Sequence, residues 1–479
     1  MLIGLAKIAD LMVSDLQVHL FLIFTFALWG VWGYKLWLSS SYKPIEGTFE
    51  GTVSVLIPTF HEEEQHLKDS IVQALKHEPF EIIVIVDERE AHVQDKIHEW
   101  FGSKVRTIIA PPGKRIAVAR AVQAARGDVI MVTASDARME PDTMRNLTAA
   151  FTDPEVGGVC GYTRAIIQSN SLASLTFFWI TEMRAKLTYR ALGSRRQVQV
   201  LDGECFAVRR EYWASVIDRY LNQRFMSVTP VSGDDGWITT LLLEDGWKTA
   251  YQENAVMHTY TPLTMHELIT QQLRWTRNSV RRSWYVLSRG IAFRIGMPYT
   301  VHTITNMVKT PFFALLVIIA SGRSLGLWDF GGGIQWMETY SDSPVVSMLS
   351  GSVAGIGAFL IGVSLTKALR ALPRYQRRTF ITDILLMPVY ALLGLFVLMP
   401  LRMYGTLTAR RITWGTRGAN KSGAAGDVLS KIGTISALAV SLTIPIALLI
   451  LLGIMSLSML PVSVALASGP MGHSWDWEY

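Results

Sequence analysis

The sequence predicts an α/β domain inserted between transmembrane helices, and three observations lead to this fold class. Hydrophobic residues make up 50% of the 479 residues and charged residues only 18%, which is a more apolar composition than is usual for a soluble protein. The apolar residues gather in long uncharged runs near the two ends of the chain. Between these runs, over residues 41–262, short β-rich segments alternate with helical ones, which is typical of a largely parallel sheet.

The first apolar run, Val18–Tyr34, contains no Asp, Glu, Lys or Arg. With its flanking residues it is long enough to span a hydrocarbon core of roughly 30 Å. It follows Asp10 and Asp15 rather than a basic segment, and no small-residue cleavage site is evident. We therefore expect residues 1–40 to form a retained anchor and not a cleaved signal peptide.

Apolar runs return after residue 296. Met297–Gly322 and Pro344–Thr366 predict a transmembrane pair within 297–368, and the uncharged run Ile432–His473 predicts a C-terminal transmembrane region within 432–479. This last run has room for one span, which we favour, or for two short ones. Thr379–Leu401 is interrupted by two prolines and Asp383, so the segment 369–431 is expected to be interfacial or re-entrant.

Loop charge predicts the orientation. The loop Arg323–Ser343 holds one basic residue against three acids, whereas Lys367–Arg378 and Arg402–Lys431 are strongly basic. The positive-inside bias places the first loop outside and the other two in the cytoplasm, together with the α/β domain. The net charge of +6 is then explained by plasma-membrane topology and attraction to membrane lipid, with no nucleic-acid partner. The two cysteines show no spacing of a disulfide framework or zinc site.

Acidic residues follow three predicted strands. Glu62 lies just beyond Val53–Ile57, Asp87 follows Ile82–Val86, and Asp136 follows Val129–Thr133. One such Asp is weak evidence, because Asp is common in turns. Ligands of parallel sheets bind beyond the carboxyl ends of the strands, so three acids there would suit a ribose, a base edge and a metal-bound diphosphate. The pattern also predicts a strand over Val105–Ile109 and helices over Glu64–His77 and Ile116–Arg126.

Basic residues stand at a predicted helix start, in Pro111-Pro112-Gly113-Lys114-Arg115. Such residues bind phosphate together with free backbone N–H groups. A solvated basic turn explains the same residues when they are taken in isolation.

Two later motifs carry more information. Asp234 and Asp235 are adjacent in a predicted loop before the helical run Ile238–Glu244, and a helix N-cap explains only one of them. Gln271-Gln272-Leu273-Arg274-Trp275 supplies an arginine for a diphosphate and a flat ring for a sugar. The alternative is a basic amphipathic helix on the membrane surface, which we expect for the second half of this segment, since Arg277, Arg281 and Arg282 follow.

In this order, the motifs resemble those of the processive family-2 membrane glycosyltransferases, which make hyaluronan, chitin oligosaccharides, cellulose and related polymers. The resemblance covers about residues 16–417 and includes Trp414-Gly415-Thr416-Arg417, which is similar to a segment of hyaluronan-type enzymes. The Gln-x-x-Arg-Trp element within 263–296, followed by interfacial helices, is specific to the polymerising branch. The resemblance implies a GT-A-like catalytic domain over 41–262.

The resemblance also implies residue roles. Glu62, Asp87, Lys114 and Arg274 would bind the nucleotide, and Asp136 would hold Mg²⁺ or Mn²⁺. Asp235 matches the catalytic base, with Asp234 as its neighbour, and Gln271 and Trp275 would border the acceptor. Two departures are present: Ala134 replaces the first acid of the Asp-x-Asp motif, and Gly236 stands where a basic residue is usual.

The implied activity is inverting, processive transfer from a UDP-sugar to a growing polysaccharide, with export along the membrane helices. An ionisable residue inside a span usually faces the protein or a water-filled path, so Lys309 fits a path for the growing chain. The alternative is that Lys309 sits near the membrane interface. Transfer of a single sugar to a lipid phosphate carrier is the first rival, which the Gln-x-x-Arg-Trp element disfavours. A transporter or an inactive carrier of this fold is the second, and the intact Asp235 and Arg274 argue against it. In Leu201-Asp202-Gly203-Glu204-Cys205 the acceptor-side loop of the family is only loosely recognisable, and we expect Cys205 to be a buried structural thiol.

Overall fold

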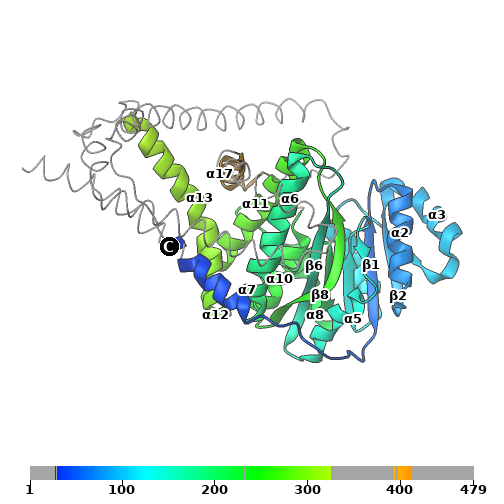
Figure 1. The fold of residues 1–479 in the computed structure, drawn as a ribbon. Helices are drawn as coiled ribbons and strands as arrows, with labels where there is room; N and C mark the ends of the chain where they lie inside the picture. Colours follow the sequence, from blue (N-terminus) through cyan, green and yellow to red (C-terminus); the bar gives the residue numbers. More distant parts are fainter. Residues whose placement is uncertain (1–26, 29, 231, 325–392, 394–396, 412–479) are drawn as a thin grey trace, which may run out of the picture.

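The computed structural model describes residues 27–28, 30–230, 232–324, 393 and 397–411 (Figure 1). These residues form an α/β domain with a group of helices packed beside it. The expected α/β fold class is thereby confirmed for the middle of the chain. The four strands predicted from the sequence are all present: β1 (Val53–Thr59), β2 (Glu81–Asp87), β3 (Arg106–Ala110) and β4 (Val129–Thr133).

The sheet has eight strands in the order β3-β2-β1-β4-β7-β6-β8-β5. The remaining strands are β5 (Arg138–Met139), β6 (Val156–Ile166), β7 (Cys205–Arg209) and β8 (Lys248–Tyr260). The expectation of a largely parallel sheet is correct only for β3-β2-β1-β4 and for the β6–β8 pair. β7 runs antiparallel to both β4 and β6, so the sheet as a whole is mixed.

Alternating side chains of the strands bury two opposite faces. In β1, Leu56 belongs to one apolar cluster, while Val55 and Ile57 belong to the other. This is the period of two expected for a strand buried on both sides. The first face is covered by α4 (Lys114–Ala124), α8 (Arg210–Ser215), α9 (Ile217–Leu221) and α10 (Asp234–Glu244). The second is covered by α2 (Glu64–Leu75), α3 (His92–Phe101) and α5 (Thr143–Thr148).

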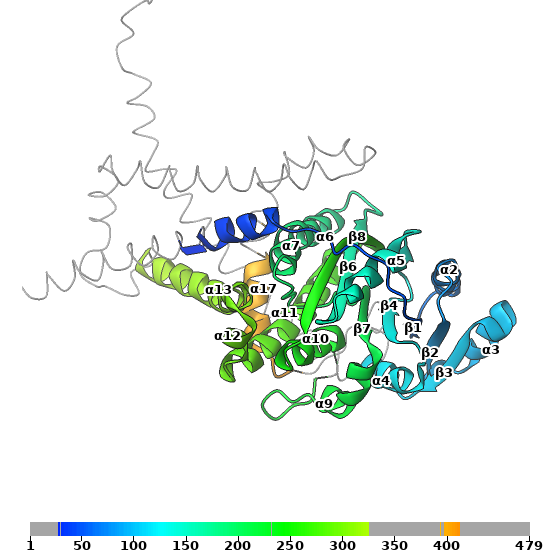
Figure 2. The same cartoon turned by 90° about the horizontal axis from the view of Figure 1, so that it is seen from below.

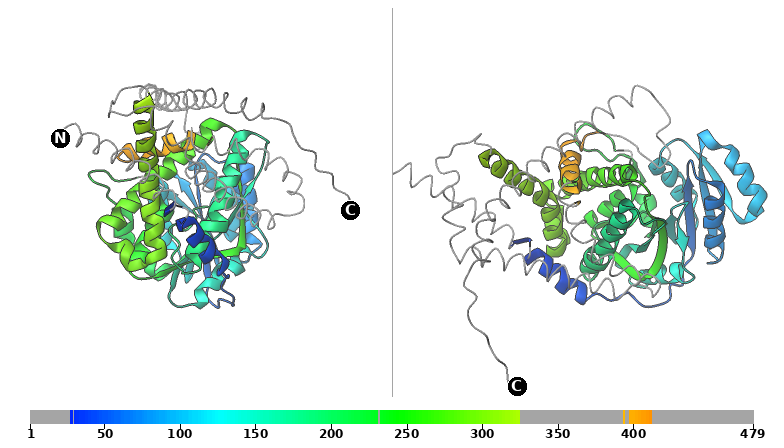
Figure 3. Two further views of the ribbon diagram at one scale, coloured as in Figure 1. Left: turned by 60° about the vertical axis from the view of Figure 1, so that its left-hand side comes forward. Right: turned by 45° about the horizontal axis from the view of Figure 1, so that its top comes forward.

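The remaining helices lie on the side of the sheet away from β3. α6 (Leu172–Met183) continues through a π-helical turn, η4 (Arg184–Tyr189), into α7 (Arg190–Gly193). α11 (Met265–Ser288) packs against α6 and α10 and is followed by α12 (Ile291–Ile295) and α13 (Met297–Ser324). α17 (Met399–Leu407) packs against both α11 and α13 (Figure 2). The α17 segment, far along the chain, therefore joins the helices that lie beside the sheet (Figure 3).

Two segments that the sequence assigns to the membrane are partly described. Residues 30–40 are helical, and α13 begins where the first span of the transmembrane pair is predicted. Among the described residues, no helix has both the length and the apolar character needed to cross a membrane. The other predicted spans, the segment 379–396 apart from residue 393, and Trp414–Arg417 lie outside the described residues.

Candidate active site

Glu62 and Asp136 lie near each other at the carboxyl edge of the sheet. The Glu62 carboxylate follows β1 and accepts a hydrogen bond of 2.7 Å from Ser135 Oγ, which follows β4. Burial raises the pKa of Glu62, the Ser135 hydrogen bond opposes this, and the negative charge of Asp136 raises it further. Two of the predicted strand-end acids are therefore brought together.

Asp87, at the end of β2, is held by an arginine that the sequence analysis did not single out. Arg89 Nε and Nη2 each donate a hydrogen bond of 2.7 Å to one of its carboxylate oxygens. The Arg89 hydrogen bond lowers the pKa of Asp87, against the opposing effect of burial. The Arg89 guanidinium also lies 4.1 Å from the centre of the Phe60 ring. The two-residue spacing of Asp87 and Arg89 was the available signal for this pair.

Lys114 and Arg115 begin α4, two residues earlier than the sequence predicts, and they have different surroundings. Lys114 Nζ lies 3.5 Å from Asp234 Oδ2. Arg115 is only 4% exposed and donates hydrogen bonds to Gln223 Oε1 and to the carbonyl oxygen of Ser232. A solvated basic turn is therefore wrong for Arg115, because its guanidinium supports the segment that precedes Asp234.

The adjacent carboxylates Asp234 and Asp235 are the first two residues of α10. The prediction of a loop before Ile238–Glu244 is therefore wrong by four residues, and Gly233, with φ of 82°, occupies the N-cap position. A side chain at Gly233 would also strike the Asn278 amide, so glycine satisfies both the backbone and the packing. Negative charge at a helix start is favoured by the helix dipole, which helps to keep two carboxylates there.

The two carboxylates have opposite electrostatic surroundings. Burial alone would raise the pKa of Asp234, but the positive charges of Lys114 and Arg115 outweigh it and hold the pKa below its usual value. Burial raises the pKa of Asp235, and the charge of Asp234 raises it further, while Arg282 and Lys114 oppose the rise. The pKa values of these two adjacent carboxyl groups are thus shifted in opposite directions, as happens where two carboxyl groups take different roles.

The Asp235 side chain faces the backbone of the Leu201–Cys205 segment. A Cβ placed on Gly203 would lie 3.0 Å from Asp235 Oδ2. The Leu201 N–H donates to Thr239 Oγ1 at 2.9 Å, and that hydroxyl donates to the Asp235 carbonyl oxygen at 2.6 Å. This segment, which the sequence made only loosely recognisable, is therefore fastened directly to the first turn of α10.

Gln271, Arg274 and Trp275 lie on α11, beside α6 and α10. Within the described part of the chain, Gln271 Oε1 and Arg274 Nε are buried without a hydrogen-bond partner. Arg274 is close enough to Asp234 for its charge to lower the pKa of that carboxylate, after burial and the larger effects of Lys114 and Arg115. The Trp275 ring centre lies 6.0 Å from that of Phe177 on α6. Of these three residues, Arg274 therefore lies near the carboxylate pair, and Trp275 packs toward α6.

The second half of α11 does not present its arginines to a membrane surface. Arg277, Arg281 and Arg282 are 7%, 4% and 8% exposed, so the expected amphipathic surface helix is wrong at these positions. Arg281 donates to the carbonyl oxygens of Ala409 and Arg411, each at 2.8 Å. The sequence could not reveal this, because the carbonyl oxygens belong to the end of the α17 segment, far along the chain.

The two cysteines have structural surroundings. Cys160 and Cys205 are free and buried, at 0% and 1% exposed. Burial raises the pKa of both thiols above its usual range, which disfavours the reactive thiolate. The expectation of a buried structural thiol at Cys205 is confirmed.

The donor set for a metal is small but chemically suitable. In the described ranges no three His, Cys, Asp or Glu residues form a group able to hold a metal ion. Asp136 and the nearby Glu62 nevertheless offer hard oxygen donors on the same side of the sheet. Mg²⁺ commonly binds through one or two carboxylates, with substrate phosphates and waters completing its shell. These residues fit a divalent ion that arrives with a diphosphate.

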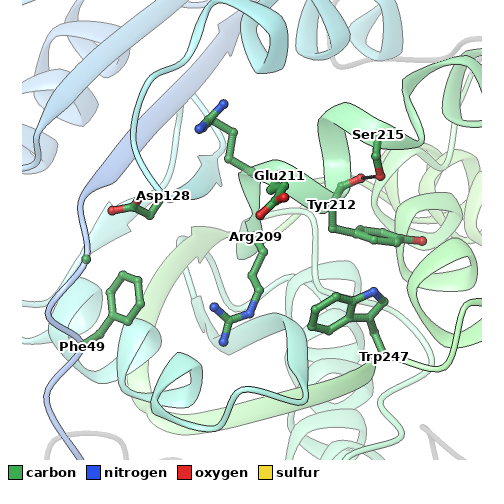
Figure 4. A pocket seen from close by; sticks show the side chains of 9 residues that line it. Phe49, Asp128, Arg209, Glu211, Tyr212, Ser215 and Trp247 are labelled. Carbon is green, nitrogen blue, oxygen red and sulfur yellow. Dashed lines mark hydrogen bonds between the residues drawn. The ribbon is translucent and has the colours of Figure 1, made fainter.

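A separate pocket lies at the opposite edge of the sheet (Figure 4). It is lined by Phe49, Gly51, Asp128, Arg209, Arg210, Glu211, Tyr212, Ser215 and Trp247. Arg209 pairs with Val129 at the beginning of β4, whereas Cys205 pairs with Thr133 at its end. The Arg209 guanidinium donates to backbone carbonyls of residues 151, 153 and 156, which gives it a structural role. This pocket is therefore not part of the site formed by the predicted residues.

Comparison with known proteins defines the class. The family described as "Glycosyltransferase like family 2" matches residues 51–278, which hold β1 to β8 and the Gln271–Trp275 motif. The chain carries a family 2 glycosyltransferase domain of the GT-A-like α/β type and is a nucleotide-sugar-dependent glycosyltransferase.

The relatives narrow the class further. A hyaluronan synthase of Streptococcus pyogenes is 26% identical over 402 residues, which cover 80% of this chain and 87% of the relative. An N-acetylglucosaminyltransferase of Mesorhizobium japonicum is 24% identical over 410 residues, or 82% and 88% of the two chains. Both relatives are named as sugar-polymer synthases or sugar transferases, and each matches this chain over about four fifths of its length.

One solved structure is a more distant match. A mannosyltransferase from Pyrobaculum calidifontis, in complex with GDP-Man and Mn²⁺, is 16% identical, with a TM-score of 0.46 over 76% of this chain and 98% of that one. This likeness is too distant to place substrates in the present chain.

Proposed function

We propose that the protein is an inverting, processive glycosyltransferase that polymerises a UDP-activated sugar into an extracellular or capsular polysaccharide and passes the product across the plasma membrane. The observation that carries the proposal is the pair Asp234 and Asp235. One carboxylate lies 3.5 Å from Lys114, and the other faces the Leu201–Cys205 segment and has a raised pKa. A carboxylate with a raised pKa at neutral pH is a stronger base than an ordinary one.

In the proposed reaction Asp235 is the catalytic base. Its carboxylate takes the proton of the acceptor hydroxyl while that oxygen bonds to the anomeric carbon. The bond from the anomeric carbon to the diphosphate oxygen breaks on the opposite face, and the diphosphate leaves with the electron pair. Attack opposite the leaving group inverts the configuration. Asp234 keeps Lys114 in place and remains ionised.

The nucleotide would lie at the carboxyl edge of the sheet, against Glu62 and Asp87. Lys114 and Arg274 would bind the diphosphate, because both are cations that lie near Asp234. Their positive charge would stabilise the negative charge of the leaving group. Asp136 would hold Mg²⁺ or Mn²⁺, which neutralises charge on the leaving diphosphate. Gln271 and Trp275 would border the acceptor, with the Trp275 ring as a stacking surface for a sugar.

The membrane part of the proposal rests on the sequence. The uncharged runs and the basic loops argue for a multi-pass protein whose catalytic domain is cytoplasmic and lies against membrane lipid. The Gln271–Trp275 element and the polysaccharide-forming relatives favour a polymer over a single transferred sugar. Helices from residue 297 onward would then line the path of the growing chain.

The test is to purify the protein in detergent and to offer UDP-sugars singly and in pairs, with Mg²⁺ or Mn²⁺. We expect UDP release together with a product that lengthens with time. A lipid-extractable single sugar would instead support transfer to a lipid phosphate carrier. No UDP release with any sugar, from protein that binds UDP, would reject the proposed activity.

A further inference from the structure

Arg184, at the junction of α6 and η4, contacts the Leu201–Cys205 segment, η4 and α11. Arg184 is the first residue of the π-helical turn, and such turns often occur at functional sites. Its side chain is 29% exposed, so it is mostly covered by protein. None of the roles proposed above uses this residue.

Arg184 makes one charged and two aromatic contacts. Its Nη2 donates a hydrogen bond of 2.6 Å to Asp202 Oδ2. Its guanidinium carbon lies 5.1 Å from the centre of the Trp275 ring and 5.4 Å from that of Tyr189. A planar guanidinium can pair with a carboxylate and stack on aromatic rings with a fixed geometry, which an ammonium group reproduces only in part.

The partner carboxylate lies one residue before the backbone that faces Asp235. Asp202 is 10% exposed on its side chain, and the next residue, Gly203, is the one whose Cβ would lie 3.0 Å from Asp235 Oδ2. The segment is fastened on one side by Thr239 of α10. On the other side the segment is held by Arg184, which follows α6, binds Asp202 and lies next to Trp275 of α11.

We propose that Arg184 is a positioning residue that sets the Leu201–Cys205 segment and Trp275 in one acceptor site next to Asp235. This inference rests on the proposed function, in which Asp235 is the base and Trp275 borders the acceptor. Arg184 acts through Asp202 and Trp275, and the nucleotide side of the site does not depend on it. Its loss therefore weakens acceptor binding and lets the growing chain leave sooner.

The chain offers a matched control on the next helix. Arg190 is 30% exposed, pairs with Glu253 at 2.5 Å and lies 6.0 Å from the Tyr42 ring centre. It therefore has the same chemistry and burial as Arg184, but its partners lie away from Asp202 and Trp275. A general loss of packing would affect both arginine variants alike.

The experiment compares Arg184→Ala, Arg184→Lys and Arg190→Ala in the full-length protein, with short oligosaccharides cut from the wild-type product as acceptors. For Arg184→Ala we expect the acceptor KM to rise about tenfold, the value of one lost charge-assisted hydrogen bond, and the product to shorten. The KM for the UDP-sugar should stay within about twofold of wild type, since no nucleotide contact is lost. Arg184→Lys should recover part of the acceptor affinity, because it keeps the charge beside Asp202.

A double variant tests the route through Asp202. If Arg184 acts through that carboxylate, adding Asp202→Asn to Arg184→Ala costs much less than Asp202→Asn costs alone. Equal effects of Arg184→Ala and Arg190→Ala, a parallel loss of UDP affinity, or additive double variants would each overturn the inference. A wild-type protein that binds UDP but turns over no UDP-sugar would instead reject the proposed function, and this inference with it.

Discussion

The two sides of the candidate site are built in different ways. On the strand side, Glu62, Asp87 and Asp136 follow strand ends, and the hydrogen-bond partner of Asp87 is a half-exposed arginine two residues away. On the helix side, Asp235 is surrounded by Gly203, Arg282 and Asp234, from three separate segments. A local contact thus holds Asp87 on the strand side, where only Glu62 reaches a distant partner, Ser135, whereas tertiary packing arranges the whole helix side. Changes on the helix side should accordingly have the larger and more specific effects.

The largest effect is expected for Asp235→Asn. A general base contributes about 10²–10⁴-fold, so turnover should fall by that range while UDP binding is retained. Steady-state UDP release and UDP affinity measured on the same preparation check this. Asp245→Asn, at the other end of α10, is the control and should stay near wild type. Near-normal turnover of the Asp235 variant would remove that residue from the mechanism.

Metal removal should have the next largest effect, on the strand side. A divalent ion contributes several kcal/mol to diphosphate chemistry, so excess chelator should lower turnover by at least about 100-fold. Added Mg²⁺ or Mn²⁺ should restore it, and Asp136→Ala should raise the metal concentration needed for half-maximal activity. Full activity in chelator would assign charge neutralisation to Lys114 and Arg274 alone.

The pH dependence of kcat/KM is expected to report on the Asp235 carboxylate of the helix side. Because the pKa of Asp235 is raised, its base form is lost as pH falls, at a higher pH than for an ordinary aspartate. Arg282 opposes that rise, so Arg282→Gln should move the acid limb of kcat/KM to still higher pH. Arg289→Gln, which lies over the Tyr285 ring at the end of α11, serves as the control. A limb that moves to lower pH in the Arg282 variant would contradict the proposed assignment.

The smallest effect is expected for Arg89→Ala on the strand side. Its side chain is 52% exposed, and exposed ion pairs are worth at most about 1 kcal/mol, or about fivefold in an equilibrium constant. The KM for the UDP-sugar should change by no more than this, with kcat unaltered. Arg126→Ala, which removes an exposed partner of Glu81 at the other edge of the sheet, should have no effect on KM. A large loss of kcat in the Arg89 variant would show that the two sides are not built as described.

Sequence alone predicted the four parallel strands and the acids that follow them, because a strand-to-helix unit is a local pattern and its polar end residues stand out from apolar runs. It also predicted that Cys205 is a buried structural thiol, but it placed Asp234 and Asp235 in a loop, whereas they are the first two residues of α10. The proposed roles of these residues remain predictions.

Only the tertiary structure decided how the helix side is arranged. The mixed strand order, the burial of Arg115, Arg277 and Arg281, and the contact of Gly203 with Asp235 depend on segments that are far apart in sequence. An arginine looks the same in a sequence whether it faces lipid, water or a buried carbonyl oxygen. Its surroundings are set by the packing of α6, α10, α11 and α17, which local propensity and periodicity do not encode.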